Sequence, residues 1–203
     1  MSEVEILPIR HFLAALEYAT SDIEQFNKGS IQGMVAELVA VRERGGRLFL
    51  IGVGGSAANC SHAAADFRTL CGIEAYAFEN VANITALTND QGWGWAYAFW
   101  LKAGQLKSTD LLYVMSVGGG TKQYSANLIA AMNYAQGLQT PIIGVAGRDG
   151  GALSVMATAC VVVPEPTDKA LITPITESMQ AVIWHLLVSH PALKRAKTAW
   201  EGK

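Results

Sequence analysis

The stretch LFLIGVGGSAANCSHAAAD, from Leu48 to Asp66, decides how this chain is organised. An unbroken apolar run, typical of a buried strand, leads into a glycine-rich turn, and an alanine-rich segment typical of a helix follows. A turn without side chains lets a ligand approach the backbone. In the helix, His62 and Asp66 are four residues apart and therefore share one face. The stretch predicts a ligand site beside a histidine and a carboxylate.

Four further runs have the same apolar character as this first strand. Helical stretches separate most of them, and continuous apolar strands alternating with helices are typical of a parallel sheet covered on both faces. We therefore expect an α/β fold with a three-layer, doubly wound, parallel five-stranded sheet. The expected strands are residues 47–53, 74–78, 111–116, 141–146 and 159–163.

Helices are expected on both sides of this region in the sequence. Two precede it, at 9–27 and 32–44, with Gly29 and Ser30 as the break between them. A late helix is expected over 173–190, before a proline. Since the chain has no evident linker or internal repeat, we expect one domain, 1–203, in which N-terminal helices (1–46) precede an α/β core with C-terminal helices (47–203).

The composition excludes several classes of protein. Hydrophobic residues make up 51% of the 203 residues and charged residues 16%, enough apolar material for the core of a soluble domain. The N-terminus does not resemble a signal peptide, and no apolar run is expected to reach the roughly 18–20 residues of a membrane helix, so we expect a cytoplasmic protein without a membrane partner. A formal net charge of −2 with scattered basic residues argues against nucleic acid. Three cysteines without Cys-x-x-Cys spacing predict reduced thiols.

The first glycine turn is compatible with two kinds of ligand. The segment Gly52–Ala57 has the spacing of a dinucleotide fingerprint, and Glu79 after the second strand could be its ribose-binding acid. Alternatively, Gly54, Gly55 and Ser56 present backbone N–H groups and a hydroxyl to a phosphate or sugar at a helix N-terminus. The turn alone does not decide between them.

A second glycine turn, SVGGGT from Ser116 to Thr121, follows the third strand and opens another helix. A dinucleotide fingerprint requires only the first turn, so two such turns after neighbouring strands favour a compact site for a phosphorylated small molecule. The alternative is that the glycines, Gly119 and Gly120 among them, only permit tight turns between strand and helix.

The motifs occur in the order found in sugar isomerase (SIS) domains. GVGGSAANCSHAAADF, ALTNDQGW, SVGGGT, GVAGRDGG and TESMQAVIWHLL cover most of the chain, and together they resemble bacterial phosphoheptose isomerases. The resemblance implies the flavodoxin-like SIS fold and the conversion of sedoheptulose 7-phosphate into D-glycero-D-manno-heptose 7-phosphate. It also implies a homotetramer with active sites between subunits, and one zinc or other divalent ion per site.

The resemblance also implies roles for individual side chains. The metal ligands would be His62, Asp66, Glu177 and His185, with Asp66 as the base and His185 as the acid of an enediol mechanism. The family has a glutamate and a glutamine where this chain has Asp66 and Glu177. Independently of the family, Glu177 and His185 share a helix face about 12 Å apart along its axis, and two imidazoles with two carboxylates suit a dication.

The implied substrate site includes residues of both turns and two loops. Departures from the family pattern at Val53, Val117 and Gly118 remove polar side chains, and Lys122 is a candidate compensating charge. Asn89, Asp90 and Asp149 could instead cap turns or helices. The full set of predicted substrate-binding residues is Gly54, Gly55, Ser56, Asn89, Asp90, Ser116, Gly119, Gly120, Thr121 and Glu177.

Three functions of different classes remain in competition. The first is a metal-assisted phosphosugar isomerase that serves heptose synthesis for cell-surface glycans such as lipopolysaccharide. The second is a non-catalytic SIS module that binds a sugar phosphate or a protein partner. The third, an NAD-dependent dehydrogenase, is weakened by the second turn and by the lack of residues for a separate substrate domain. The aromatic stretch Gly92–Trp100 predicts a core or subunit contact.

Overall fold

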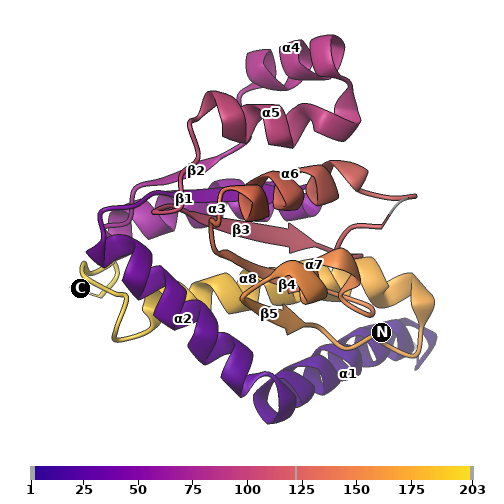
Figure 1. Cartoon of the computed structure of the whole chain (residues 1–203). Helices are drawn as coiled ribbons and strands as arrows, with labels where there is room; N and C mark the ends of the chain where they lie inside the picture. Colours follow the sequence, from indigo (N-terminus) through magenta and orange to yellow (C-terminus); the bar gives the residue numbers. More distant parts are fainter. Residues whose placement is uncertain (1–2, 122, 202–203) are drawn as a thin grey trace.

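The computed structural model describes residues 3–121 and 123–201, with side chains from Pro8 onward. Figure 1 shows a central sheet with helices on both of its faces. All five strands are parallel, in the order β2-β1-β3-β4-β5. The expected doubly wound, three-layer architecture is confirmed.

The strands lie where the apolar runs predicted them. Strands β1, β3 and β4 are buried along their whole length, which explains why their sequences are continuously apolar rather than alternating. The bounds are β1 Leu48–Gly52, β2 Ala75–Ala77, β3 Leu111–Ser116, β4 Ile142–Ala146 and β5 Ala159–Val162.

Eight α-helices and two short 3₁₀ helices are present in the described part of the chain. The α-helices are α1 Glu3–Phe26, α2 Lys28–Glu43, α3 Gly55–Cys71, α4 Val81–Gln91, α5 Ala96–Ala103, α6 Ala126–Gly137, α7 Gly151–Met156 and α8 Ile172–Ser189. The 3₁₀ helices are η1 Trp93–Trp95 and η2 Lys169–Leu171.

The break between α1 and α2 was predicted at the wrong residues. Gly29 and Ser30 lie inside α2, and the junction is Asn27. Its side-chain oxygen accepts a hydrogen bond of 3.2 Å from the backbone N–H of Val162 in β5. A tertiary contact, which the local sequence does not contain, therefore fixes the corner.

Each face of the sheet has its own apolar core. The side chains of Leu48 and Leu50 point to the face covered by α2, α3 and α8, and those of Phe49 and Ile51 to the face covered by α5, α6 and α7. Helix α4 lies outside α5, farther from the sheet (Figure 1), and none of its residues is fully buried.

Helix α8 is an exception to the expectation that no segment reaches membrane length. The segment Lys169–Ser189 is long and apolar enough by length and composition, although 44% of the tested window is buried inside the fold. Its side chains Ile175, Trp184 and Leu187 belong to the core, and a core helix of a soluble protein meets the same criterion. The apolar residues of α8 are therefore explained by its packing against the core of the fold.

The aromatic stretch is divided between core and surface. Tyr97 is 2% exposed, which confirms the expected core contact. Trp93 and Trp95 are 43% and 58% exposed, so the alternative of a subunit contact stays a prediction for this half.

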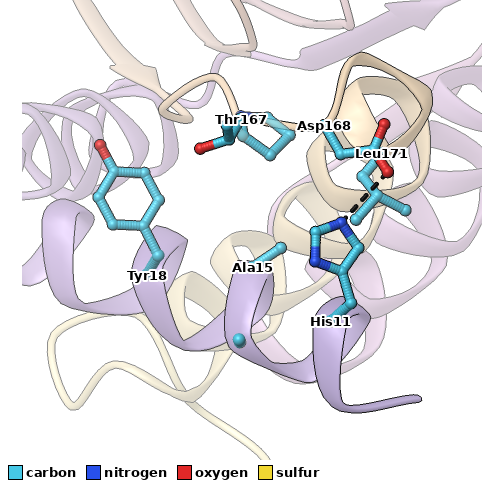
Figure 2. A pocket seen from close by; sticks show the side chains of 8 residues that line it. His11, Ala15, Tyr18, Thr167, Asp168 and Leu171 are labelled. Carbon is cyan, nitrogen blue, oxygen red and sulfur yellow. Dashed lines mark hydrogen bonds and ion pairs between the residues drawn. The ribbon is translucent and has the colours of Figure 1, made fainter. Parts of the chain in front are cut away.

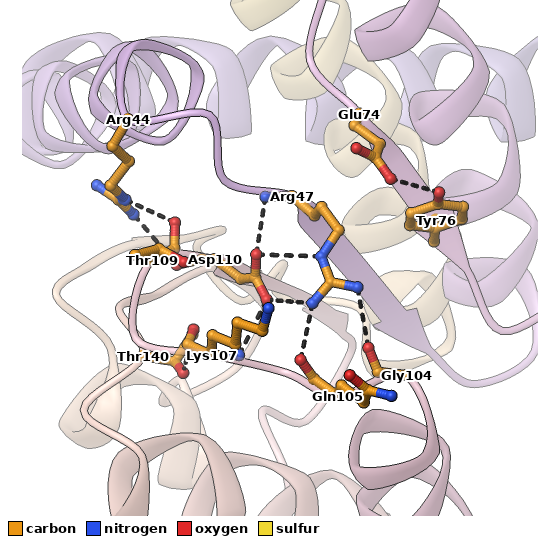
Figure 3. A network of polar contacts seen from close by, with 10 residues as sticks. All are labelled: Arg44, Arg47, Glu74, Tyr76, Gly104, Gln105, Lys107, Thr109, Asp110 and Thr140. Atoms are coloured by element: carbon orange, nitrogen blue, oxygen red, sulfur yellow. Dashed lines mark hydrogen bonds and ion pairs between the residues drawn. The ribbon is translucent and has the colours of Figure 1, made fainter.

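A network of hydrogen bonds joins the segments that precede β1 and β3, at the amino ends of the strands (Figure 3). The carboxylate of Asp110 accepts hydrogen bonds from the backbone and guanidinium of Arg47 and from the backbone N–H of Lys107. Arg47 also donates to the carbonyls of Gly104 and Gln105, and its hydrogen bond to Asp110 raises the pKa of the guanidinium. The network holds the ends of β1 and β3 together.

At the opposite, carboxyl ends of the strands, the connections that follow β1 and β3 lead away from each other. The chain leaves β1 toward β2 on one side and β3 toward β4 on the other, so the two connections diverge. In parallel α/β sheets, ligands bind at this switch point. Both glycine turns, after β1 and after β3, lie there.

Candidate functional site

Helices α3 and α8 bring three predicted metal ligands together. His62 and Asp66 come from α3 and His185 from α8, and their ligand atoms all lie within 4.8 Å of one another. Among the described residues, this is the one group of three or more histidine, cysteine or acidic side chains with such spacing. We call it the triad. Two imidazole nitrogens and a carboxylate oxygen are a donor set that fits zinc.

The triad is accessible to solvent and to small ligands. The side chain of His62 is 63% exposed and that of Asp66 is 25% exposed, and the His62 Nε2 to Asp66 Oδ2 distance is 4.0 Å. The His62 and His185 rings are 5.7 Å apart and nearly perpendicular. The nitrogens therefore face a common space without blocking it.

A backbone contact orients His185. Its Nδ1 lies 2.8 Å from the carbonyl oxygen of Ala181. Because a carbonyl only accepts, Nδ1 carries the proton and donates it. Nε2 is then the nitrogen that can bind a metal or exchange a proton with a substrate.

A buried tryptophan packs against both histidines. Trp184 is 1% exposed, stacks on His185 at 3.5 Å between centroids, and meets the His62 ring edge-on at 4.7 Å. It restricts the orientations of both rings. This role was not predicted from the sequence, although Trp184 directly precedes His185.

A polar bridge sets the axial register between α3 and α8. The side-chain amide of Asn59 donates to the carbonyl of Glu177 at 3.0 Å and to Oε1 of the fully buried Gln180 at 3.2 Å. Asn59 lies three residues before His62, on the same side of α3. This contact was not predicted, since it joins residues more than a hundred positions apart.

Glu177 is not brought into the triad. Its carboxylate lies against Gly55, the first residue of α3: a Cβ on Gly55 would lie 2.3 Å from Oε2 and 2.7 Å from Oε1. The absence of a side chain at position 55 is what makes room for this carboxylate. Its predicted part in metal binding stays a prediction.

The backbone of the first turn is closely packed, but one of its hydroxyl groups has no hydrogen-bond partner among the described residues. Gly54 has φ +63°, and a Cβ on Gly52 would lie 2.7 Å from the backbone of Ser56, so both positions require glycine. The buried hydroxyl of Tyr97 donates to the carbonyl of Gly52. The hydroxyl of Ser56 is buried and has no hydrogen-bond partner among the described residues.

The hydroxyl groups of the second turn are hydrogen-bonded within the fold, whereas the N–H groups of Gly118 and Gly120 have no acceptor among the described residues. The hydroxyl of Ser116 accepts from the N–H of Gly119 at 3.1 Å. The carbonyls of Gly119 and Gly120 accept from the first N–H groups of α7, at 2.9 and 3.0 Å. The Thr121 hydroxyl accepts from the N–H of Tyr124 at 2.9 Å. Lys122, the candidate compensating charge, lies outside the described residues.

A profile of the SIS domain family matches residues 11–147. The chain belongs to the SIS domain family. A phosphoheptose isomerase from Roseiflexus sp. is 34% identical over 140 residues, which are 66% of this chain and 68% of that protein. A phosphoheptose isomerase from Helicobacter pylori is 27% identical over 187 residues, covering 88% of this chain and 90% of that one. The lincomycin biosynthesis protein LmbN of Streptomyces lincolnensis is 34% identical over 161 residues, which cover only 56% of LmbN.

Solved structures share the SIS fold with this chain. The phosphoheptose isomerase GmhA from Neisseria gonorrhoeae has a TM-score of 0.78 at 24% identity, covering 91% of this chain and 96% of that one. A phosphoheptose isomerase from Francisella tularensis has a TM-score of 0.76 at 24% identity, covering 93% and 97%. The resemblance to phosphoheptose isomerases is confirmed in sequence and in fold.

Three predicted loop residues of this SIS domain make local contacts. Asn89 and Asp90 are exposed on α4 and hydrogen-bonded to each other at 2.8 Å. The carboxylate of Asp149 accepts from the N–H of Gly151 at 3.2 Å, at the start of α7, as the capping alternative predicted. Substrate contacts from Asn89 and Asp90 stay predictions.

Another cavity, of about 210 Å³, lies between α1 and the loop that leads into η2 (Figure 2). On its rim, His11 Nε2 is 3.2 Å from Asp168 Oδ2. The N–H of Ala170 and the ring of His11 hold the pKa of Asp168 below its usual value. None of the cavity's lining residues belongs to the triad, and the pair joins α1 to this loop.

Cys60 is a packing residue of the SIS core. It is 1% exposed, and burial raises the pKa of its thiol. Since the thiolate is the reactive form, a reactive role close to the first turn is not supported.

Proposed function

We propose that this protein is a phosphosugar isomerase that interconverts a ketose phosphate and an aldose phosphate, with sedoheptulose 7-phosphate as the first substrate to test. The observation that carries the proposal is the triad, whose ligand atoms lie within 4.8 Å of one another at the edge of the α3–α8 contact. The phosphoheptose isomerases that cover about nine tenths of this chain support the reaction class.

The reaction moves a proton between adjacent carbons through an enediol. Asp66, as a carboxylate, takes the carbon-bound proton, and His185 exchanges a proton with the oxygens through Nε2, since Nδ1 is engaged with Ala181. His62 faces both groups. General acid–base catalysis of this kind contributes about 10²–10⁴-fold to the rate.

In place of these acid–base roles, His62, Asp66 and His185 would hold a divalent ion, for which zinc fits the donor set best, because a metal on Nε2 of His185 occupies the nitrogen that would otherwise exchange the proton. A bound dication supplies electrostatic stabilisation of the negative charge that develops on the substrate oxygens. Glu177 is the proposed fourth ligand, and its carboxylate must then leave its place against Gly55.

The assembly proposed is a homotetramer with active sites between subunits. On α8, Val182 and Leu186 are 50% and 41% exposed and flank His185. Together with α1 and α2 they line an apolar groove of about 300 Å³. A partner subunit that covers this face would lie next to the triad. We propose that the protein acts in the cytoplasm, in heptose synthesis for cell-surface glycans.

The test is an NMR time course with sedoheptulose 7-phosphate in D₂O, with added zinc and with a chelator. We expect aldoheptose phosphate with deuterium at C2, and loss of turnover on chelation. His185→Ala should lower kcat at least about 100-fold. The matched control is His190→Ala, because His190 lies beyond the end of α8 and accepts a hydrogen bond from Ala192.

One observation favours a second function, the non-catalytic SIS module. The hydroxyls of the second turn are engaged internally, so they do not point to a preformed phosphate site. Stabilisation by a sugar phosphate without any turnover of it would support the module and count against the isomerase.

A further inference from the structure

A cavity of about 310 Å³ lies on the α5 side of the sheet, over β1 and β2. In the parallel register, Phe49 of β1 is paired with Tyr76 of β2, so both side chains point to this side. Phe49 is buried in the core beside α5, whereas Tyr76 is 43% exposed. Helix α4, which follows β2 in the chain, lies outside α5 instead of covering β2 (Figure 1). This arrangement leaves the sheet uncovered next to Tyr76.

Three aromatic rings form the apolar part of the cavity's lining. The rings of Tyr76 and Trp100 both contact the ring of Phe49, at 5.9 and 5.5 Å between centroids. They are inclined to it by 38° and 76°, and therefore to each other by at least the difference of these two angles. The Tyr76 hydroxyl donates to the carboxylate of Glu74, which restricts the orientation of its ring (Figure 3). Because the two outer rings are not parallel, they cannot enclose a flat ligand between their faces.

Polar side chains without partners border these rings. Glu79 and Asn83 line the cavity and are exposed, and their side chains make no hydrogen bond or ion pair with any described residue. The side-chain oxygen of Asn80 accepts from the backbone N–H of Asn83, and its N–H₂ group has no acceptor in the same part of the chain. The cavity therefore offers a carboxylate that accepts hydrogen bonds and amides that donate them, the groups that bind hydroxyls.

The charges around the cavity favour a neutral ligand. An anion would lie beside the carboxylate of Glu79, and like charges repel. A cation would lie beside Arg47, whose guanidinium is 4.9 Å from the centroid of the Phe49 ring and already occupies one face of that ring. Arg47 is itself paired with Asp110 at 2.7 Å, so it does not attract an anionic ligand in the place of that carboxylate.

We propose that this cavity is a second carbohydrate site, which binds a neutral, non-phosphorylated pyranose ring. The C–H groups on one face of such a ring pack against Tyr76 and Trp100, where burial of apolar surface stabilises them, and its hydroxyls bond to Glu79 and Asn83. A volume of about 310 Å³ lies at the lower end of the range for small-molecule sites, about 300–1,000 Å³, and suits one sugar ring. No residue of the lining belongs to the triad, so the proposal does not depend on the proposed function.

The test is saturation-transfer difference NMR of the whole protein with the methyl glycosides of α-D-glucose, α-D-mannose and β-D-galactose. These probes have no phosphate, and their blocked anomeric carbon prevents isomerisation. We expect at least one of them to bind with a Kd of about 1 mM, with the strongest saturation on the C–H protons of one ring face. Because no step of the test needs turnover, failure of the isomerase assay and failure of this proposal are separate results.

Two variants place the bound sugar in the cavity. Glu79→Gln and Tyr76→Ala should each weaken binding about tenfold or more, since one removes a charged acceptor and the other an aromatic contact. The matched controls are Glu43→Gln at the end of α2 and Tyr18→Ala on α1, both exposed and outside this cavity, and they should bind as the wild type does. A thermal melt of each variant shows that it is folded.

The absence of saturation with all three glycosides would overturn the proposal, as would wild-type binding by both Glu79→Gln and Tyr76→Ala. Choline and adenosine are measured in the same way. Tighter binding of either than of every glycoside would assign the cavity to an organic cation or a flat base, and would overturn its assignment to a neutral sugar.

Discussion

The two glycine turns look alike in sequence and differ in what their polar groups contact. Around the first turn, the Ser56 hydroxyl is unpartnered within the described structure and the Glu177 carboxylate lies on Gly55. In the second turn, the Ser116 hydroxyl and the carbonyl of Gly119 are bonded to the turn itself or to α7. The first turn therefore has an unpartnered hydroxyl and a carboxylate, whereas the second turn has engaged hydroxyls and, among the described residues, unpartnered backbone N–H groups at Gly118 and Gly120.

This difference shows why a glycine-rich turn after a strand is an incomplete indicator of a ligand site. Glycine at position 55 leaves room for the end of a side chain from α8, whereas glycine at position 119 leaves room for another segment of backbone. Glycine therefore occurs in both turns for different structural reasons. Substitutions that separate these two reasons test the comparison.

The largest difference is expected between Gly119→Ala and Gly55→Ala. At Gly119, φ is +65° and a Cβ would lie 1.8 Å from the carbonyl oxygen of Gly150, so backbone must move and the free energy of unfolding should fall by about 3 kcal/mol or more. At Gly55 the obstacle is the end of the flexible Glu177 side chain, and alanine is the better helix former, so the change should stay within about 1 kcal/mol. Urea denaturation measures both, and equal losses would refute the distinction.

A smaller effect is expected from the bridge that aligns α8 with the helix of the first turn. Asn59→Ala leaves Oε1 of the buried Gln180 without its donor, and should lower the free energy of unfolding by about 2 kcal/mol. Because the register of His62 and His185 depends on this bridge, zinc affinity measured by calorimetry should fall as well.

The matched control is Thr69→Val on the same helix. The Thr69 hydroxyl donates to the carbonyl of Ala65 at 3.0 Å on the exposed side of α3, so stability should change by about 0.5 kcal/mol or less and zinc affinity should be unchanged. Zinc binding by Asn59→Ala at wild-type affinity would show that the bridge serves stability alone.

The smallest expected effect distinguishes the serines of the two turns. Ser116→Ala leaves the buried N–H of Gly119 without its acceptor and should cost about 1 kcal/mol. Ser56→Ala removes a buried hydroxyl that has no described partner, so stability should be unchanged or slightly higher. Chemical denaturation compares them, and a larger loss for Ser56→Ala would mean that its hydroxyl is bonded in the folded protein.

Local sequence predicted the sheet and two of the three members of the triad. Apolar runs predicted all five strands, and those of β1, β3 and β4 are continuously apolar because burial on both faces leaves no room for polar residues. The spacing of His62 and Asp66 placed both on one face of α3, as the structure shows. His185 required the family resemblance, since a lone histidine in an apolar helix is more often a packing residue.

The remaining features depend on contacts between distant segments. The α1–α2 corner at Asn27 depends on β5, and the Asn59–Gln180 bridge joins α3 to α8. Glu177 was expected to bind the same metal ion as His185, and its carboxylate lies instead against Gly55 at the start of α3. No local pattern encodes such contacts, because side-chain direction across an interface is set by how two helices pack.

The sequence by itself determined the order of strands and helices, the two turns and the residue types available for chemistry, since these follow from periodicity, burial and backbone freedom. Only the tertiary structure decided which turn retains an unpartnered hydroxyl, which nitrogen of His185 is available, and which side chains surround the triad. The physical reason is that hydrogen bonds and charges act over a few ångströms in space, whatever the distance along the chain.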